Sequence, residues 1–588
     1  MTDKGSMRRI LNRMRDGMSA GKLGAILPYV VIIVLTILLS IWIQWGTTGS
    51  FANGDAYIHM AYAKNLATRQ ELTYNPGNHE GIGTSSILWT FVLAILHWFQ
   101  GSPVLWARVF GIGLLALGAC LIYDITWSVL RRHAAQPKRI LAMGVAMLAM
   151  LSGNMIWSAQ SGMETILFVA LGLLALKAYA SEHRFLLGAV LGLLVLTRIE
   201  GVILAGAVFL IDLLHKRRIS SGMLKTAAPI ALLVLPWMGY LQLREGAPTT
   251  NSLNARNFYL KEVNGRIAGE FPKLAWLFNT PVILYVVSWI VFLVIYNTGL
   301  TSFIGPAAEV HINELATTLD ISIPGVTIGL IISLALVANA IHWLWSSRKL
   351  LSLKYAEDRM LLILGLWMAL HNLAYALFLP RFGGGGRYAP FNTMLYWVLL
   401  GVGAYTFMRR KLRIVGVGCV VLLMAFSLNY WKDVYFANTD NLTNVREAAA
   451  HYIDEQLPPD RAIGAIDIGV QRYFAQQPVV DLAGHINSDV LTYWESEGGV
   501  SDYLFDKQLC HISVQGPLDG VGLDIAHALG LDSDERFDLV PEIVFATPID
   551  QWKRGVGPHL YMPATYIYRI QWHDQTFCDD VLPVSQGS

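Results

Sequence analysis

Residues 23–45 read LGAILPYVVIIVLTILLSIWIQW, an apolar run without a single charged side chain. A helix needs about 20 apolar residues to cross a bilayer, so this run predicts a membrane-spanning helix. The run is too long for the core of a signal peptide, and no small-residue cleavage site is evident. Six basic residues precede it: Lys4, Arg8, Arg9, Arg13, Arg15 and Lys22. Because cytoplasmic flanks are enriched in Lys and Arg, we expect the N-terminus to lie in the cytoplasm.

The composition of the whole chain is also that of a membrane protein. Hydrophobic residues make up 54% of the 588 residues, charged residues only 15%, and the mean hydropathy is +0.45. Soluble domains contain about 25% charged residues, so a soluble protein, a disordered chain and a nucleic-acid-binding protein are poor fits. Four cysteines exclude a disulfide-rich scaffold. Further apolar runs occur near residues 103–130, 139–159, 163–181, 184–214, 222–243, 277–298, 323–345, 359–379, 388–408 and 413–431.

The formal net charge of +2 hides an uneven distribution along the chain. Residues 1–431 contain 35 Lys and Arg against 18 Asp and Glu, whereas residues 432–588 contain 9 against 24. An apolar, basic body followed by an acidic tail is typical of a membrane module joined to a soluble domain. We therefore predict two domains: an α-helical polytopic membrane module over residues 1–431 and a soluble domain over residues 432–588.

Basic clusters near residues 131–139, 216–218, 348–354 and 409–413 should lie in the cytoplasm. This requires that residues 87–99, which are too few to cross, skim the membrane. It also requires that residues 184–214 cross twice, turning at residues 197–201, and that residues 277–298 be re-entrant or interfacial. The result is eleven full crossings with the tail outside. A single helix over residues 184–214 would instead bury Arg198 and Glu200 at mid-membrane.

This orientation places the polar segments on one side of the membrane. The loops 46–86, 160–163, 197–201, 244–276 and 380–387 and the tail all fall on the outer side. A site assembled from them would therefore face the periplasm or the cell exterior.

The first of these loops reads GDAYIHMAYAKNLA over residues 54–67. Tyr57, Ala61 and Lys64 have helical spacing, which puts Asp55 at or just before the start of a helix. Asp is among the best N-caps, so capping is an equally good interpretation of Asp55. A turn follows at residues 72–77, and then the short apolar run. The loop thus predicts an amphipathic helix, a turn and a membrane-skimming helix.

Several short motifs occur together in this chain. They are DAYIHMAYAKNL at residues 55–66, YNPG at 74–77, TSSILWT at 84–90, SGMET at 161–165, LTRIEG at 196–201, GRY at 386–388 and VVDLAG at 479–484. In this order they resemble the GT-C glycosyltransferases, multi-span enzymes that use a polyprenyl-phosphate sugar. The chain looks most like the group that contains the actinobacterial terminal arabinofuranosyltransferases.

The resemblance implies an inverting sugar transfer, and the residues present suit each of its requirements. Asp55 is the candidate base for the acceptor hydroxyl. Arg387 and Arg198, with the neighbouring Tyr388, are candidates for holding the donor phosphate, because Arg offers a fixed fork of donors. The candidates for orienting the sugar are Glu164, Glu200, His59 and Tyr57.

Other interpretations of these residues stay open. Arg387 could be a membrane-edge anchor, and Glu164 and Glu200 could simply pair with Arg198. His59 lies one helical turn after Asp55 and could equally belong to a solvated helix face.

The chain departs from the family pattern at two places. Gly54 stands where the family usually has the first of two adjacent acids, which puts a two-carboxylate or metal-bridged arrangement in doubt and leaves open whether a divalent cation takes part. The loop near residues 247–259 also differs, so the specificity of the family cannot be transferred. No P-loop and no dinucleotide motif indicate another cofactor.

The tail alternates between strand and helix patterns. Residues 462–467 and 479–482 predict strands and residues 471–475 a short helix, which indicates a small α/β domain. Asp467, Asp481 and His485 lie at the strand ends, where ligands often bind in open α/β sheets, so they are candidates for the acceptor side. Turn formation is the alternative for them. Cys510 and Cys578 lie in the compartment where disulfides persist, and we expect them to pair.

The leading hypothesis is therefore a membrane enzyme that moves arabinofuranose from a polyprenyl phosphate to an extracytoplasmic acceptor. The acceptor would be a cell-envelope glycan or a surface protein. A hexose or amino-sugar donor is an alternative within the same chemistry. A transporter or lipid flippase is an alternative of another class, but no internal repeat typical of transporters is evident.

Overall fold

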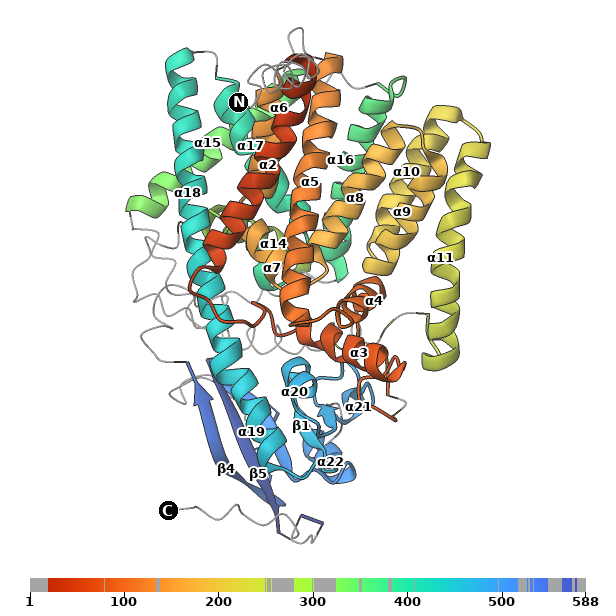
Figure 1. Ribbon diagram of the computed structural model, residues 1–588, viewed down its shortest axis with the longest axis vertical. Helices are drawn as coiled ribbons and strands as arrows, with labels where there is room; N and C mark the ends of the chain where they lie inside the picture. The colour runs from red at the N-terminus through yellow and green to blue at the C-terminus, as the bar shows by residue number, and fades with distance from the viewer. Residues whose placement is uncertain are drawn as a thin grey trace, which may run out of the picture.

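The computed structural model shows a long helical bundle with a smaller α/β domain at one end (Figure 1). It describes residues 20–578 with gaps at residues 79, 134–137, 249, 251–254, 256–279, 299, 301–323, 348–351, 379–382, 408, 495, 497, 517–525, 527–528, 532–533, 548–562 and 574–576. The basic residues before Lys22, those at 348 and 349, and most of the loop near residues 247–259 lie outside the described residues.

Five helices within the described ranges are long and apolar enough to cross a membrane. They are α2 (Ala20–Gln44), α5 (Pro103–His133), α11 (Ser221–Glu245), α16 (Ala356–Phe378) and α18 (Arg410–Asn441). Helices α6 (Arg139–Met150) and α7 (Gly153–Gln160) would add a sixth span, bent by 59°. The bundle is completed by α8 (Thr165–Ala180), α9 (Arg184–Thr197), α10 (Gly201–Lys216), α14 (Pro281–Val291) with the π-helix η2 (Phe292–Tyr296), α15 (Pro324–Ser347) and α17 (Pro390–Tyr405).

The apolar run 184–214 is divided as the sequence predicts. Helix α9 ends at Thr197 and α10 begins at Gly201, with Arg198 in an extended conformation between them. The break keeps Arg198 and Glu200 out of a helix interior and lets their charges meet partners. The total of eleven crossings remains a prediction, because α8, α9 and parts of α14 and α15 are shorter apolar helices.

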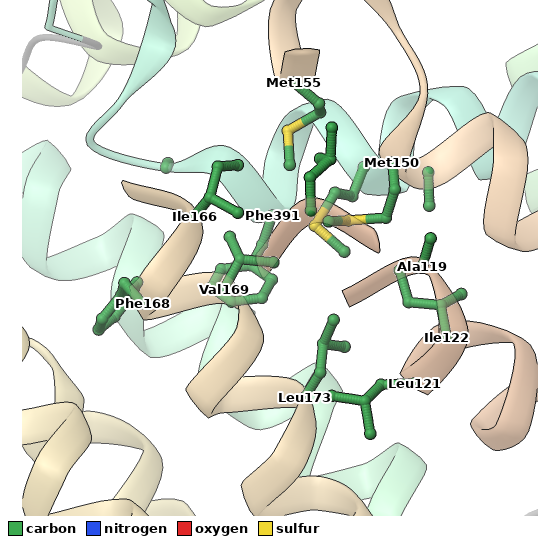
Figure 2. Packing of buried hydrophobic residues seen from close by; sticks show 14 of the residues in the cluster. Ala119, Leu121, Ile122, Met150, Met155, Ile166, Phe168, Val169, Leu173 and Phe391 are labelled. Atoms are coloured by element: carbon green, nitrogen blue, oxygen red, sulfur yellow. The ribbon is translucent and has the colours of Figure 1, made fainter. Parts of the chain in front are cut away.

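The centre of the bundle is closely packed by aliphatic and aromatic side chains (Figure 2). Ala119 and Ile122 of α5, Met150 at the end of α6, Val169 of α8 and Phe391 of α17 all lie in one buried cluster. Lipid tails are as apolar as these side chains, so the helices associate through tight packing rather than through hydrophobic transfer. This packing fixes the positions of the helix ends.

The first outer loop forms the predicted pair of helices between the bundle and the α/β domain (Figure 1). They are α3 (Ala56–Arg69) and α4 (Ile87–Leu96), and the latter has only 10 residues, too few to cross. The Ser86 side chain caps α4 by accepting a hydrogen bond from the Trp89 amide. Asn65 of α3 donates to the carbonyls of Thr73 and Tyr74, which fixes the intervening turn.

The tail begins as a continuation of α18. That helix runs without interruption past residue 432 into the π-helix η6 (Leu442–Glu447) and α19 (Ala448–Gln456). A five-stranded sheet follows, in the order β2-β1-β3-β5-β4. Strand β1 pairs in parallel with β2 and β3, and β5 pairs antiparallel with both β3 and β4. The strands are β1 (Ile463–Ala465), β2 (Val479–Asp481), β3 (His511–Gly516), β4 (Phe537–Ala546) and β5 (Ala564–Trp572), and the helices between them are α20 (Ile468–Phe474), α21 (Val490–Trp494) and α22 (Gly499–Asp506). The predicted strand–helix–strand unit is thus present.

A disulfide joins Cys510 to Cys578, the pair that the sequence predicted, with Cα atoms 5.6 Å apart. It fixes the segment after β5 against the beginning of β3. Phe577, next to the bridge, packs its ring on Trp572 and Phe505. The bridge therefore closes the outer end of the tail's core.

We expect the double variant Cys510→Ser, Cys578→Ser to lose stability in the tail. The bridge closes a segment with a sequence separation of 68 residues, and native bridges of this kind contribute about 2–4 kcal/mol. Thermal unfolding of the purified chain should show an earlier transition. Cys120→Ser, which changes an unbridged cysteine in α5, is the matched control and should leave that transition unchanged. Equal transitions in the double variant and the wild type would contradict the prediction.

Candidate functional site

Asp55 occupies the N-cap position of α3 but does not cap the helix with its side chain. Its carboxylate instead forms an ion pair with Arg387, from the far end of the membrane module. The Asp55 side chain is 43% exposed, so a ligand can reach it. The capping interpretation therefore does not describe this residue.

Arg387 follows a short turn of glycines, η5 (Gly384–Gly386), just before α17. Its side chain is 8% exposed. Nη2 reaches Asp55, whereas Nε and Nη1 have no hydrogen-bond partner among the described residues. A buried guanidinium with unsatisfied donors is costly. These two donors mark the place where an anionic ligand would be most stabilised.

Arg198 differs from Arg387, because its guanidinium is already surrounded by partners. Nη1 donates to Glu164 at 3.3 Å and to the Arg387 carbonyl at 3.1 Å. Nη2 donates to Glu200 at 3.0 Å and to the Tyr375 hydroxyl at 2.8 Å. The two acids thus pair with Arg198, one of the alternatives that the sequence left open. Both terminal nitrogens of Arg198 thus already have partners within the protein.

Glu164 and His59 connect this cluster to the first outer loop. The Glu164 carboxylate lies 3.6 Å from Nε2 of His59, and Nδ1 of His59 is 2.7 Å from the Thr84 hydroxyl. The Thr84 hydroxyl is in turn 2.8 Å from that of Thr90. His59 is buried and does not belong to a solvated helix face.

Aromatic rings cover the inner side of the two arginines. Tyr388 stacks on Tyr375 with ring centroids 5.6 Å apart. The guanidinium carbons of Arg387 and Arg198 lie 5.3 and 5.6 Å from the centre of the Tyr388 ring. Cations at this distance from an aromatic face are attracted to it, so Tyr388 helps to hold both arginines in place.

The glycine turn before Arg387 admits no side chain at Gly385. Its φ is +65°, and an added Cβ would lie 2.1 Å from the Trp157 ring. Asn154 donates to the Gly385 carbonyl at 2.6 Å. The turn is therefore pressed against α7, and this contact sets the position of Arg387.

We expect Gly385→Ala to destabilise the protein by about 1–3 kcal/mol. The new methyl group must displace the Trp157 ring, and the alanine backbone must keep a left-handed conformation. Gly365→Ala is the matched control, since an added Cβ there meets no atom within 4 Å. Thermal unfolding should separate the two variants clearly. Equal stability of both would show that the turn can relax at no cost.

A cavity opens beside Asp55, between the first outer loop and the tail. It is lined by Asp55, Ile58, His59, Gly83, Ser85, Met163, Ile466, Asp467, Ile468 and His485. Four predicted site residues, two from each domain, therefore share this cavity.

Two predicted site residues lie elsewhere. Tyr57 faces away from the cavity and packs between Phe51, Tyr473 and Phe474. The sequence could not show that the tail covers this part of α3. Asp481 is fully buried and accepts hydrogen bonds from the amides of Ala483 and Ile486. It forms a turn, which was the alternative interpretation.

The structure adds residues that sequence patterns did not single out. Tyr375 binds both Arg198 and Glu200 from inside α16. Arg446 of η6 forms an ion pair with Asp467 at 2.9 Å, and Gln515 of β3 donates to the same carboxylate at 2.8 Å. These partners are separated by long stretches of chain and have no local motif.

A divalent cation finds no ready set of ligands here. Among the described residues, no three His, Cys, Asp or Glu side chains converge in a way that could hold a metal ion. Gly54 supplies no carboxylate next to Asp55, and Asp55 itself pairs with Arg387. We derive no chemical step through a cation.

Residues 435–555 match a family described as a domain of unknown function, DUF8728. No curated protein matches the chain.

Solved structures with a related arrangement include two of an oligosaccharyltransferase from Archaeoglobus fulgidus. The apo form is 12% identical, covers 83% of this chain and 69% of its own, and has a TM-score of 0.47. The AglB complex with an inhibitory peptide and a dolichol-phosphate is 13% identical with the same coverage and TM-score. ArnT from Cupriavidus metallidurans is 12% identical over 92% of this chain and 97% of its own, with a TM-score of 0.46. At these values the function has to be argued from the chain's own residues.

Proposed function

We propose that this protein is a membrane glycosyltransferase of the GT-C type that uses a polyprenyl-phosphate sugar as donor. The observation that carries the proposal is the Asp55–Arg387 pair, in which a buried guanidinium keeps two donors, Nε and Nη1, without a partner. A lipid phosphate supplies the anion that these donors need, and the adjoining carboxylate supplies a base. The ordered motifs of the sequence point to the same chemistry.

In the proposed reaction, Asp55 accepts the proton of the acceptor hydroxyl as the oxygen attacks the anomeric carbon of the sugar. The bond between this carbon and the phosphate oxygen breaks, and the electron pair leaves with the polyprenyl phosphate. Arg387 stabilises the departing charge through Nε and Nη1 while Nη2 orients Asp55. One planar guanidinium thus fixes the distance between the base and the leaving group.

We further propose that the donated sugar is arabinofuranose and that the acceptor is a cell-envelope glycan or a surface protein. These assignments rest on the resemblance to terminal arabinofuranosyltransferases. The same site could serve a hexose or amino-sugar donor, because the atoms of Arg387 and Asp55 contact only the phosphate and the acceptor. We place the protein in the cytoplasmic membrane, with the N-terminus inside and the tail in the periplasm, on the charge distribution of its loops.

The direct test is transfer by purified protein in lipid nanodiscs. Decaprenyl-phosphoryl arabinose is offered first, followed by polyprenyl-phosphate hexoses and amino sugars, each with a panel of glycan and protein acceptors. We expect release of polyprenyl phosphate and a glycosylated product with arabinose and little with the other sugars. Preference for another sugar would replace the arabinose assignment. The absence of turnover with every polyprenyl-phosphate sugar would refute the enzyme proposal.

A further inference from the structure

The α/β domain forms part of the cavity wall. Of the lining residues, Ile466, Asp467, Ile468 and His485 come from the tail. They lie at the carboxyl end of β1, at the start of α20 and after β2. The rest of the lining comes from the first outer loop and Met163. The cavity therefore exists only where the two domains meet.

The two domains approach each other so closely at Gly54 and Gly469 that a side chain at either position would collide with the facing domain. An added Cβ at Gly54 would lie 2.7 Å from Nη1 of Arg446 and 3.4 Å from Oδ1 of Asp467. An added Cβ at Gly469 would lie 2.8 Å from the Gly54 carbonyl oxygen. The space beside Asp55 that a side chain at Gly54 would occupy is thus taken by an ion pair from the tail. Figure 1 shows α20 next to α3, below it and to the left, in agreement with this contact.

Asp467 is fixed at one oxygen and open at the other. Arg446 and Gln515 both donate to Oδ2, at 2.9 and 2.8 Å. Oδ1 accepts no hydrogen bond from the described residues, and Asp467 lines the cavity. Arg446 is held in turn by a hydrogen bond to the Asn441 side chain at 3.2 Å. The arrangement is that of a positioned carboxylate with one oxygen available to a ligand.

The charge of the lining selects the kind of ligand. Asp55 and Asp467 both face the cavity, whereas no Lys or Arg belongs to the described residues that line it. Arg387 and Arg446 do not line the cavity. Arg387 forms an ion pair with Asp55, and Arg446 forms an ion pair with Asp467. Burial is the largest effect on Asp467 and, with the charge of Asp55, it raises the pKa of this carboxyl above its usual value, although Arg446 partly offsets the shift. A carboxylate in this setting accepts hydrogen bonds from hydroxyl groups and repels phosphate.

We infer that Asp467 is a substrate-binding residue of the cavity, positioned by Arg446, and that it makes the cavity select an uncharged, hydroxyl-bearing sugar over a phosphorylated one. This inference rests on the proposed function, because it assigns the cavity to a sugar. It adds a specificity role for the α/β domain and explains why Gly54 has no side chain. Selectivity arises because a phosphate would face two carboxylates at once.

The test measures binding, so it does not depend on turnover. The full chain in nanodiscs is titrated with methyl α-arabinofuranoside and with its 5-phosphate, and both are followed by saturation-transfer NMR. We expect the wild type to bind the neutral sugar at least tenfold more tightly. Asp467→Asn should weaken binding of the neutral sugar about tenfold and bring the two affinities together. Arg446→Gln should act in the same way, whereas Arg446→Lys should retain part of the preference.

Asp489→Asn is the matched control, because it removes a tail carboxylate that pairs with Lys507 on the surface. It should bind both probes as the wild type does, and thermal unfolding must show that all variants are folded. An unchanged preference in folded Asp467→Asn, or a wild type that binds neither sugar or prefers the phosphate, would overturn the inference. A selective wild type without transfer activity would leave the inference intact and refute the proposed reaction instead.

Discussion

Replacing Arg387 by Gln is expected to lower sugar transfer at least about 10³-fold. The amide cannot neutralise the leaving phosphate, and it leaves Asp55 without its partner. Losses of 10²–10³ follow removal of one donor to a developing anion, and here three donors disappear together. Turnover of decaprenyl-phosphoryl arabinose by the purified variant measures the loss.

Arg387→Lys distinguishes geometry from charge. Its single ammonium cannot contact Asp55 and the phosphate in the planar arrangement of a guanidinium, so we expect a loss of about 10²-fold despite the retained charge. Arg536→Gln is the control, because Arg536 forms exposed ion pairs with Asp502 and Asp534. It should transfer at the wild-type rate. A folded Arg387→Gln variant with more than a tenth of wild-type activity would contradict the assignment.

Asp55→Asn is expected to reduce kcat by about 10²–10⁴-fold while KM for the donor changes little. The amide keeps the size of the side chain but cannot accept the acceptor proton, and loss of a general base has effects of this size. Because Arg387 still reaches the phosphate, the variant should bind polyprenyl phosphate. Steady-state kinetics together with a binding assay measure both parts.

Two further variants complete this prediction. Asp55→Glu should recover part of the activity, since it restores a base in a displaced position. Asp538→Asn removes a carboxylate from the tail surface, where it pairs with His573. This variant should transfer sugar at the wild-type rate. Full activity in Asp55→Asn would assign the base elsewhere, and a loss of donor binding without a change in kcat would make Asp55 a structural partner of Arg387.

The features that the sequence predicted well are those with local causes. The interruption between α9 and α10 follows from placing Arg198 and Glu200 inside an apolar run, where charges are too costly for a helix interior. The short apolar run after Ser86 could not cross because of its length. The strand–helix–strand unit of the tail followed from alternation over a few residues.

The errors and omissions have long-range causes. Asp55 and Arg387 are separated by 332 positions, so no spacing could show that they pair or that Arg387 keeps two donors unfilled. Tyr57 does not line the cavity, because its side of α3 is covered by α20, which follows more than 400 residues later. Arg446 was not singled out, since its role depends on the absence of a side chain at Gly54. The sequence thus indicated the chemistry of the site, and the packing of the domains decided which residues take part.

The most direct measurement is a structure of the protein in nanodiscs with decaprenyl phosphate bound. The account predicts phosphate oxygens about 2.7–3.2 Å from Nε or Nη1 of Arg387, with Asp55 beside them and the cavity on the far side of the carboxylate. Phosphate bound at another place, with these two donors of Arg387 still unfilled, would contradict it.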